Sequence, residues 1–253
     1  MNQLLDMTGK VVAVTGGTRG VGRGIVDGFR AAGATAIACA RKAPGDDRRD
    51  VPFVEVDVRD ADAIDRAVAR IVADHGRLDV LVNNAGGAPF ADAATASPRF
   101  SAAIIALNLT APLQFAQRAN QQMQSQATGG VIINIASVSG TRPSPGTAAY
   151  GAAKAGLLNL TQSLAVEWAP KVRVAAVTAG MIRTESAHLH YGSEAGIAAV
   201  AATVPLGRLG LPEDVGNACV FLASPMASYL SGSSIVVHGG GERPAFLDAA
   251  RTK

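Results

Sequence analysis

The sequence predicts a single doubly wound α/β domain over residues 1–253, with a seven-stranded parallel sheet and helices on both faces. Short, continuously apolar runs alternate with longer segments of helical periodicity, which is typical of a parallel sheet buried between two helical layers. The composition agrees, because 48% of the residues are hydrophobic and only 4% are aromatic, as suits a core of small and β-branched side chains. No linker or internal repeat divides the chain.

The predicted strands are the short apolar runs, and the first of them leads directly into a glycine-rich turn. In chain order they cover residues 11–15, 35–40, 51–58, 78–86 (a strand with its exit loop), 130–137, 172–178 and 233–239.

The predicted helices are longer and carry capping residues at their ends. They cover residues 22–33, 59–76, 97–124, 147–169 and 211–224. Asp60 and Ser97 are predicted N-caps, with Pro98 at the first helical position after Ser97. Gly33 and Gly76 are predicted to end the first two helices.

Two segments depart from the alternation. Residues 185–206 are Ala-rich with two histidines, and they are predicted as a substrate-binding flap, although a structural helix fits the pattern equally well. Residues 43–50 are predicted as a solvated loop in place of a helix, where neighbouring aspartates neutralise Arg48 and Arg49.

Charge and cysteine content exclude several functional classes. The net charge is +3 and the cations are not gathered on one segment, so no nucleic-acid partner is expected. Cys39 and Cys219 lie far apart, without metal or redox spacing, and are expected to be free thiols in a reducing cytoplasm. No signal peptide or membrane-spanning run is apparent, so a cytoplasmic protein without a membrane partner is expected.

The first strand leads into the turn "TGGTRGVG", residues 15–22, which predicts a dinucleotide-binding site. Gly16, Gly20 and Gly22 permit a tight turn and a close approach of backbone to a ligand, and the following helix N-terminus presents N–H groups to a pyrophosphate. The spacing is Gly-x3-Gly-x-Gly, and a tight structural turn is the alternative interpretation.

Three polar side chains predict an acid–base site. Tyr150 and Lys154 are four residues apart on a predicted helix and therefore share one face. An ammonium close to a phenol is expected to stabilise the phenolate and lower its pKa, so that the phenol can exchange a proton with a carbonyl or alcohol oxygen. Ser137 ends a predicted strand, where it can bond the same oxygen. The alternatives are a chance surface pair and a loop serine.

The chain resembles the short-chain dehydrogenase/reductase family, which has a Rossmann fold, from about residue 8 to residue 240. The resemblance is carried by "TGGTRGVG", "NNAG" (83–86), Asn108, Ser137, "YGAAK" (150–154) and "PLGRLGLPEDVG" (205–216). It implies an oxidoreductase acting on CH–OH and C=O groups, with Tyr150 as general acid/base, Ser137 orienting substrate, Lys154 on the nicotinamide ribose and Asn108 supporting a relay water. On its own, Asn108 also fits a buried polar residue satisfied by backbone.

The resemblance also implies which residues contact the cofactor. They are Gly16, Thr18, Arg19, Gly20, Val21, Gly22, Ala40, Arg41, Lys42, Asp57, Val58, Asn84, Ala85, Gly86, Tyr150, Lys154, Gly180, Ile182 and Thr184. Within this set, Asp57 is expected to hold the adenine, and Gly180, Ile182 and Thr184 to lie on the nicotinamide side.

The end of the second strand predicts NADP(H) rather than NAD. An acidic side chain there would bind the ribose hydroxyls of NAD, but this chain has Ala40, followed by Arg41, whose guanidinium suits a 2′-phosphate. Arg19 in the glycine turn completes a pattern that resembles NADP-preferring members, and Lys42 is a possible helper.

The sequence departs from the family at several positions. Thr178-Ala179-Gly180 stands where many members have Pro-Gly, and Ala175 where asparagine is common. Residues 121–128 contain no cation, which disfavours substrates bound to an acyl carrier protein.

The leading hypothesis is an NADP(H)-dependent carbonyl reductase or alcohol dehydrogenase acting on a small molecule. The alternatives are an NAD-linked dehydrogenase and a non-catalytic nucleotide-binding regulator. A homotetramer is expected from the resemblance, with a dimer as alternative. His188 and His190 are expected to contact solvent or substrate, and no metal site is predicted.

Overall fold

A computed structural model of the chain describes residues 3–45 and 50–250, and it contains the predicted parallel sheet. The strand order is β3-β2-β1-β4-β5-β6-β7, and all neighbours pair in parallel. The strands are β1 (Val11–Thr15), β2 (Thr35–Ala40), β3 (Phe53–Glu55), β4 (Val80–Asn83), β5 (Gly130–Ser137), β6 (Val172–Ala179) and β7 (Ser234–Val237). The predicted seven-stranded α/β domain is therefore confirmed.

The five predicted helices are present within a few residues of their predicted ends, and one of them is interrupted. In chain order the helices are α1 (Gly20–Ala31), α2 (Ala61–His75), α3 (Pro98–Ile105), α4 (Ala111–Ser125), α5 (Ala148–Glu167), α6 (His188–Tyr191), α7 (Glu194–Thr203), α8 (Pro212–Ala223) and α9 (Ala245–Ala249), and α6, α7 and α9 are additional to the predicted ones. Short 3₁₀ turns cover Gln3–Leu5, Val138–Gly140 and Pro225–Ala227.

The predicted caps of α2 and α3 are confirmed. The Asp60 carboxylate accepts hydrogen bonds from the backbone N–H groups of Asp62 and Ala63, and the Ser97 hydroxyl accepts one from Phe100 N. Gly76 ends α2 in the left-handed conformation, with φ of 75°. Local sequence therefore sets where these helices begin and end.

The predicted helix 97–124 is interrupted by a π-helical turn at Ala106–Thr110. The N–H of Ala111 donates to Ala106 O, five residues earlier, instead of the usual four. Pro112 follows and has no N–H, so the carbonyl of Asn108 lacks its usual helical donor. The prediction of one regular helix was wrong at this turn, which contains a candidate catalytic residue.

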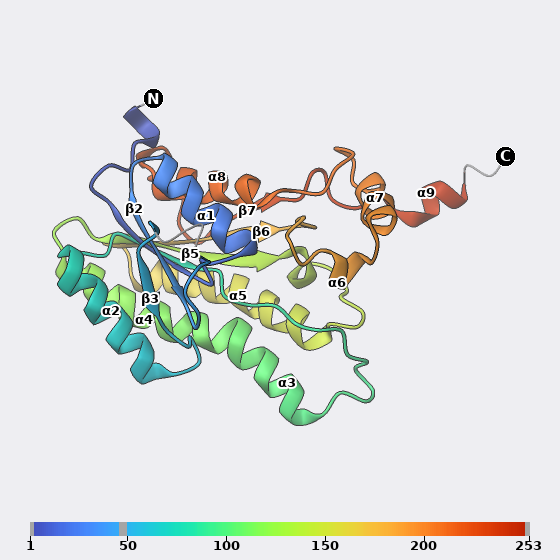
Figure 1. Ribbon diagram of the computed structural model, residues 1–253, viewed down its shortest axis with the longest axis horizontal. Helices are drawn as coiled ribbons and strands as arrows, with labels where there is room; N and C mark the ends of the chain where they lie inside the picture. The colour runs from blue at the N-terminus through green and yellow to red at the C-terminus, as the bar shows by residue number, and fades with distance from the viewer. Residues whose placement is uncertain (1–2, 46–49, 251–253) are drawn as a thin grey trace.

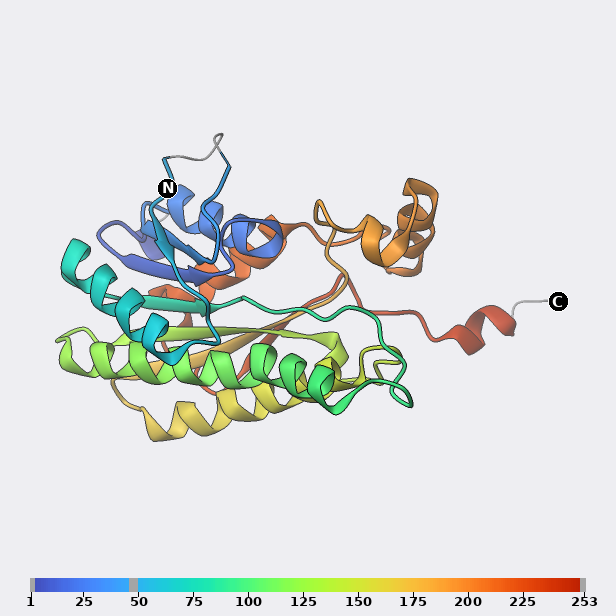
Figure 2. The same ribbon diagram turned by 60° about the horizontal axis from the view of Figure 1, so that its bottom comes forward.

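Helices cover both faces of the sheet, as Figures 1 and 2 show. One face packs against α1 and α8, and the opposite face packs against α2, α4 and α5. Strand residues alternate between the two cores: Val12 and Val14 of β1 join the first, whereas Val11 and Ala13 join the second.

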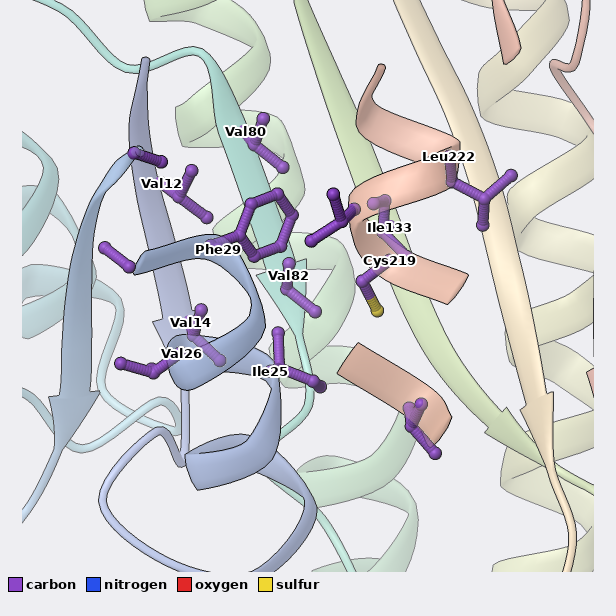
Figure 3. Close-up of a cluster of buried hydrophobic side chains, with 14 of the residues drawn as sticks. Val12, Val14, Ile25, Val26, Phe29, Val80, Val82, Ile133, Cys219 and Leu222 are labelled. Atoms are coloured by element: carbon purple, nitrogen blue, oxygen red, sulfur yellow. The ribbon is translucent and has the colours of Figure 1, made fainter. Parts of the chain in front are cut away.

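The core under α1 and α8 is shown in Figure 3. Phe29 is fully buried among Val12, Val80 and other aliphatic side chains, and its loss to alanine would cost about 3–5 kcal/mol. Glycine lets the two helices meet closely, because a Cβ on Gly24 would lie 2.4 Å from Pro212 Cβ. This packing fixes the start of α8 against α1, close to the glycine turn.

Strand β3 is shorter than the predicted run 51–58. It pairs only with β2, from Ala38↔Phe53 to Ala40↔Glu55, because it lies at the edge of the sheet. The described residues between β2 and β3 contain no helix, in agreement with the predicted loop at 43–50. The expected neutralisation of Arg48 and Arg49 falls outside the described residues.

Residues 185–206 contain α6 and α7 and are called the α6–α7 segment below. Ala187, Ile197 and Val204 of the segment form a small apolar cluster together with Leu209, which follows the segment. It follows β6 and therefore lies beyond the carboxyl ends of the strands (Figure 2). In both views α9 projects from the body of the domain at the same end.

Within residues 3–45 and 50–250, no helix combines the length and the apolar character that a membrane span requires. Both cysteines, Cys39 and Cys219, are buried free thiols.

Candidate active site

The predicted site residues lie along the carboxyl edge of the sheet, because all strands are parallel and end at the same edge. Those that follow strands are Gly16, Thr18, Arg19, Gly20, Val21 and Gly22 after β1; Ala40, Arg41 and Lys42 at the end of β2; Asp57 and Val58 after β3; Asn84, Ala85 and Gly86 after β4; Ser137 at the end of β5; and Gly180, Ile182 and Thr184 after β6. Tyr150 and Lys154 lie on α5, and Asn108 lies in the π-helical turn.

The turn after β1 has the geometry that a phosphate group requires. Gly16 has φ of 66°, and its N–H donates to Cys39 O at 2.7 Å. A Cβ on Gly22 would lie 2.2 Å from Gly16 O and 2.5 Å from Asn84 Nδ2, so only glycine fits. In the described part of the chain no acceptor is found for the N–H groups of Val21 and Gly22, which remain available at the start of α1. The turn therefore fits a dinucleotide pyrophosphate.

Thr15, which the sequence analysis did not single out, joins this turn to the loop after β4. Its hydroxyl accepts hydrogen bonds from Asn84 N and Ala85 N, both at 2.9 Å. Asn84 Nδ2 in turn donates to Thr15 O at 2.8 Å. The position of Thr15 at the end of a strand, next to the exit loop of the neighbouring strand, could have indicated this role from the sequence.

Asn108 fixes the backbone on the other side of the same loop. Its side chain is fully buried, donates to Ile104 O at 2.9 Å and to Gly87 O at 3.0 Å, and accepts from Gly87 N at 2.8 Å. These bonds match the backbone-satisfied alternative that the sequence left open. A Cβ on Gly86 would lie 2.6 Å from Asn108 Oδ1 and 3.4 Å from Lys154 Nζ, so the loop lies close to the lysine.

Ser137, Tyr150 and Lys154 come together between β5 and α5. Lys154 is buried, with 3% of its surface exposed, and its Nζ donates to Ile135 O at 2.7 Å. The same Nζ lies 5.6 Å from the centroid of the Tyr150 ring. Tyr150 is half-buried, and its side chain is hydrogen-bonded to that of Ser137. The geometry presents a phenol and a hydroxyl side by side, with an ammonium next to the ring.

Burial dominates the ionisation of both α5 groups. It raises the pKa of Tyr150, and the hydrogen bond with Ser137 opposes that rise only in part. Burial also lowers the pKa of Lys154 from 10.5 to about 8. Burial is therefore the largest influence on the Tyr150 pKa in the structure, and Lys154 Nζ lies beside the ring while it donates to backbone.

Charged side chains gather where the adenosine end of a dinucleotide would lie. Arg41 and Lys42 are exposed just beyond β2. Both Asp57 carboxylate oxygens accept from the Arg59 guanidinium, at 3.0 Å from Nε and 2.7 Å from Nη2. This pairing lowers the Asp57 pKa to about 2, and the charge of Arg41 adds to the effect. Sequence reasoning missed Arg59, although its position two residues after Asp57 was a usable signal.

The turn at the end of β6, Thr178-Ala179-Gly180, is held by bonds to β7. Gly180 N donates to Val237 O at 2.8 Å, and the hydroxyls of Thr178 and Ser234 lie 2.7 Å apart. A Cβ on Gly180 would lie 2.6 Å from His238 Cβ, so this position also requires glycine.

The next residues approach the glycine turn. Thr184 Cγ2 would lie 3.5 Å from a Cβ on Gly20, and the Gly20 N–H donates to Glu185 Oε1 at 2.9 Å. Glu185 was not among the predicted site residues. A cavity of about 540 Å³ adjoins this contact, between the start of α1, the start of α8 and the α6–α7 segment.

A small apolar cavity of about 70 Å³ lies on the other side of Tyr150. Alanines of the loop after β4 and of the first turn of α5, together with Pro89, Phe100, Ile104 and Gly146, make up most of its wall. A small hydrocarbon group could therefore lie beside the phenol.

Arg142, Glu242 and Tyr191 interact electrostatically with one another. Arg142, in the loop after β5, forms an ion pair with Glu242 of the C-terminal segment. Burial raises the pKa of Tyr191 on α6, Glu242 raises it further and Arg142 opposes the rise. Tyr191 also makes a small contribution to the raised pKa of Tyr150. His188 and His190 are exposed on α6, and no metal-binding group of side chains occurs among the residues described.

Comparison with protein families agrees with this arrangement. The family profile described as enoyl-(acyl carrier protein) reductase matches residues 15–242. A short-chain type dehydrogenase/reductase of Sinorhizobium fredii is 38% identical over 92% of this chain, which spans 43% of the length of that relative. The acetoacetyl-CoA reductase of Rhizobium meliloti is 36% identical over 91% of this chain and 98% of its own length.

Solved structures give the same picture. The ligand-free aldohexose dehydrogenase of Thermoplasma acidophilum matches with a TM-score of 0.87 and 31% identity, over 92% of this chain and 94% of the matched chain.

Proposed function

Because the chain belongs to the short-chain dehydrogenase/reductase family of nicotinamide-dependent oxidoreductases, we propose that it is an NADP(H)-dependent carbonyl reductase or alcohol dehydrogenase. The observation that carries this proposal is the cluster of Ser137, Tyr150 and Lys154 at the carboxyl edge of the sheet, beside a turn that fits a pyrophosphate. A non-catalytic nucleotide-binding regulator would not need this acid–base group.

In the proposed reaction, Tyr150 exchanges the proton. When bound, a nicotinamide cofactor would supply the hydride-transfer chemistry at the substrate carbon. Ser137 donates a hydrogen bond to the substrate oxygen and keeps it within reach of the Tyr150 hydroxyl. Lys154 holds a positive charge near the phenol, and Asn108 fixes the Gly87 backbone beside it. In reduction the phenol transfers its proton to the carbonyl oxygen as negative charge develops there.

Tyr150 has the protonation state that a general acid requires. A general acid must be protonated at the start of the reaction, and a phenol, whose pKa burial here raises further, is neutral at physiological pH. A nearby ammonium would then stabilise the phenolate that proton transfer leaves behind.

The preference for NADP(H) is supported by the residues after β2. Ala40 offers no carboxylate to repel a 2′-phosphate, and Arg41 is exposed directly after it. Arg19, also exposed, is the N-cap of α1 in the glycine turn. Guanidinium groups bind phosphate through two parallel hydrogen bonds, which suits both arginines for this role.

The substrate is proposed to be a small carbonyl compound or secondary alcohol with an apolar substituent. The cavity beside Tyr150 is lined mainly by alanine and other apolar side chains, which favours hydrocarbon over sugar hydroxyls in that position.

A homotetramer, with a dimer as alternative, and a cytoplasmic location complete the proposal. The proposed assembly rests on the family to which the chain belongs. The two free thiols, Cys39 and Cys219, support a reducing compartment.

Steady-state oxidation of NADPH and NADH tests the proposal against a panel of ketones, quinones, β-ketoacyl thioesters and steroids. We expect turnover of at least one ketone and a higher kcat/KM with NADPH. Absence of turnover with every carbonyl and both cofactors would refute the assignment, and a preference for NADH would refute its cofactor part.

A further inference from the structure

A carboxylate from the α6–α7 segment caps the helix that carries the phosphate-binding turn. Gly20 is the first residue of α1, and its N–H donates to Glu185 Oε1 at 2.9 Å. The two residues are 165 positions apart in the sequence. The N-cap residue, Arg19, makes no capping bond through its own side chain, so the anion at this helix end comes from a different part of the fold.

This carboxylate occupies the type of position that a phosphate group requires. The N-terminus of a helix stabilises any anion through its free N–H groups and its dipole, whether the anion is a carboxylate or a phosphate. Gly20, Val21 and Gly22 form one short stretch of backbone, so an anion bound to Gly20 and a pyrophosphate bound to the same helix start repel each other.

Glu185 has room to move away. Its side chain is exposed, and it lines the cavity of about 540 Å³ together with Thr184, Arg23 and Glu213. A change of side-chain rotamer therefore suffices to free the Gly20 N–H, and neither α1 nor the sheet has to change.

We propose that Glu185 is a positioning residue that competes with the dinucleotide pyrophosphate for the start of α1 and thereby limits cofactor affinity. The inference rests on the proposed function, because it concerns the same cofactor site. Binding of the cofactor moves Glu185 off Gly20 and so releases the link between the glycine turn and the α6–α7 segment. The affinity for dinucleotide is therefore lower than the glycine turn alone would give.

The test is isothermal titration calorimetry of the full-length protein with NADPH and, separately, with adenosine 2′-monophosphate. The second compound has the adenine and the 2′-phosphate but no pyrophosphate. We expect Glu185→Ala to tighten NADPH binding about fivefold, and Glu185→Gln to tighten it less, since its amide oxygen still accepts from Gly20 without the negative charge. Neither variant should change the dissociation constant of adenosine 2′-monophosphate.

Glu213→Gln is the matched control. Glu213 lines the same cavity and also lies in the first turn of a helix, α8, so the variant removes the same charge at a similar place without touching Gly20. Its NADPH affinity should equal that of the unchanged protein. A thermal melt of each variant confirms that it is folded before titration.

Unchanged or weaker NADPH binding in both Glu185 variants would overturn the inference, as would equal tightening by Glu213→Gln, which would indicate a general charge effect. If neither the unchanged protein nor the variants bound NADPH or NADH, the proposed function would fall together with the inference. If the unchanged protein and every variant bound NADPH with the same affinity, the inference about Glu185 would be wrong and the proposed function would stand.

Discussion

Lys154→Met should make the protein more stable near neutral pH while it removes the proposed activity. The buried ammonium has its pKa lowered from 10.5 to about 8, so burying the charged form costs on the order of 3 kcal/mol relative to the unfolded chain. The hydrogen bond from Nζ to Ile135 O offsets part of this cost and is lost in the variant. We expect a net gain of about 1–2 kcal/mol in the free energy of unfolding near pH 7.

The pH dependence of the stability difference shows whether the buried charge of Lys154 is its cause. Because the folded-state pKa of Lys154 lies below the unfolded value, the unfolded chain binds more protons between about pH 8 and 10.5. The stability of the unchanged protein therefore rises with pH through this window relative to the variant, and below about pH 8 the full penalty is present. The difference between the two proteins should shrink by about 2 kcal/mol from about pH 7 to about pH 9.5.

Urea unfolding of both proteins at several pH values measures this difference. Other groups that titrate in the window, such as the thiols of Cys39 and Cys219 in the unfolded chain, are common to both proteins and cancel. Lys171→Met is the control, because Lys171 is exposed and its Nζ also donates to a backbone carbonyl, Gln124 O. A pH-independent difference for Lys154→Met, or the same behaviour in the control, would refute the argument that burial depresses the Lys154 pKa.

Three further substitutions test the site. Gly22→Ala should destabilise the protein by about 2 kcal/mol and abolish dinucleotide binding in calorimetry, because a Cβ at this position overlaps Gly16 O. Gly28→Ala, whose Cβ would lie 3.4 Å from Gly216, is the control and should be nearly neutral. Equal effects of the two substitutions would contradict the argument that only glycine fits at position 22. Asn108→Ala removes the side-chain partners of the N–H and C=O of Gly87, which water replaces in part because Gly87 is exposed, and it should cost about 1–2 kcal/mol in urea unfolding; a loss under about 0.5 kcal/mol would contradict it. Arg41→Ala should lower the NADP/NAD ratio of kcat/KM about tenfold or more, and an unchanged ratio would remove Arg41 from the cofactor site.

Sequence periodicity was sufficient for the sheet and for most of the helices. A short, continuously apolar run such as Val11–Thr15 is typical of a strand buried on both faces, and residues four apart on a helix, such as Tyr150 and Lys154, must share a face. Capping residues such as Asp60 added the helix boundaries, because their hydrogen bonds are local.

The π-helical turn at Ala106–Thr110 was missed, although the sequence contains a signal for it. Pro112 cannot donate a backbone hydrogen bond, and a proline inside a predicted helix should have indicated an irregular turn just before it. The same turn contains Asn108, whose side chain bonds to Gly87, a contact between elements that no local pattern contains.

The ionisation of Tyr150 and the Glu185–Gly20 contact depend on tertiary structure. The sequence places an ammonium near the phenol, but burial is what sets the direction of the pKa shift, and burial depends on the packing of α5 against β5. Glu185 reaches Gly20 only because β6 and β1 end at the same edge of the sheet.

The single-turnover rate of ketone reduction by the Tyr150→Phe variant tests the central proposal most directly. The variant keeps the ring that packs beside Lys154 but removes the hydroxyl, so the cofactor should still bind while the proton donor is lost. With NADPH bound and a ketone substrate identified in the screen, we expect the single-turnover rate to fall by about 10²–10⁴-fold, with the NADPH dissociation constant within about twofold of the original value. A variant that reduces the ketone at the original rate would contradict the assignment of Tyr150 as the general acid.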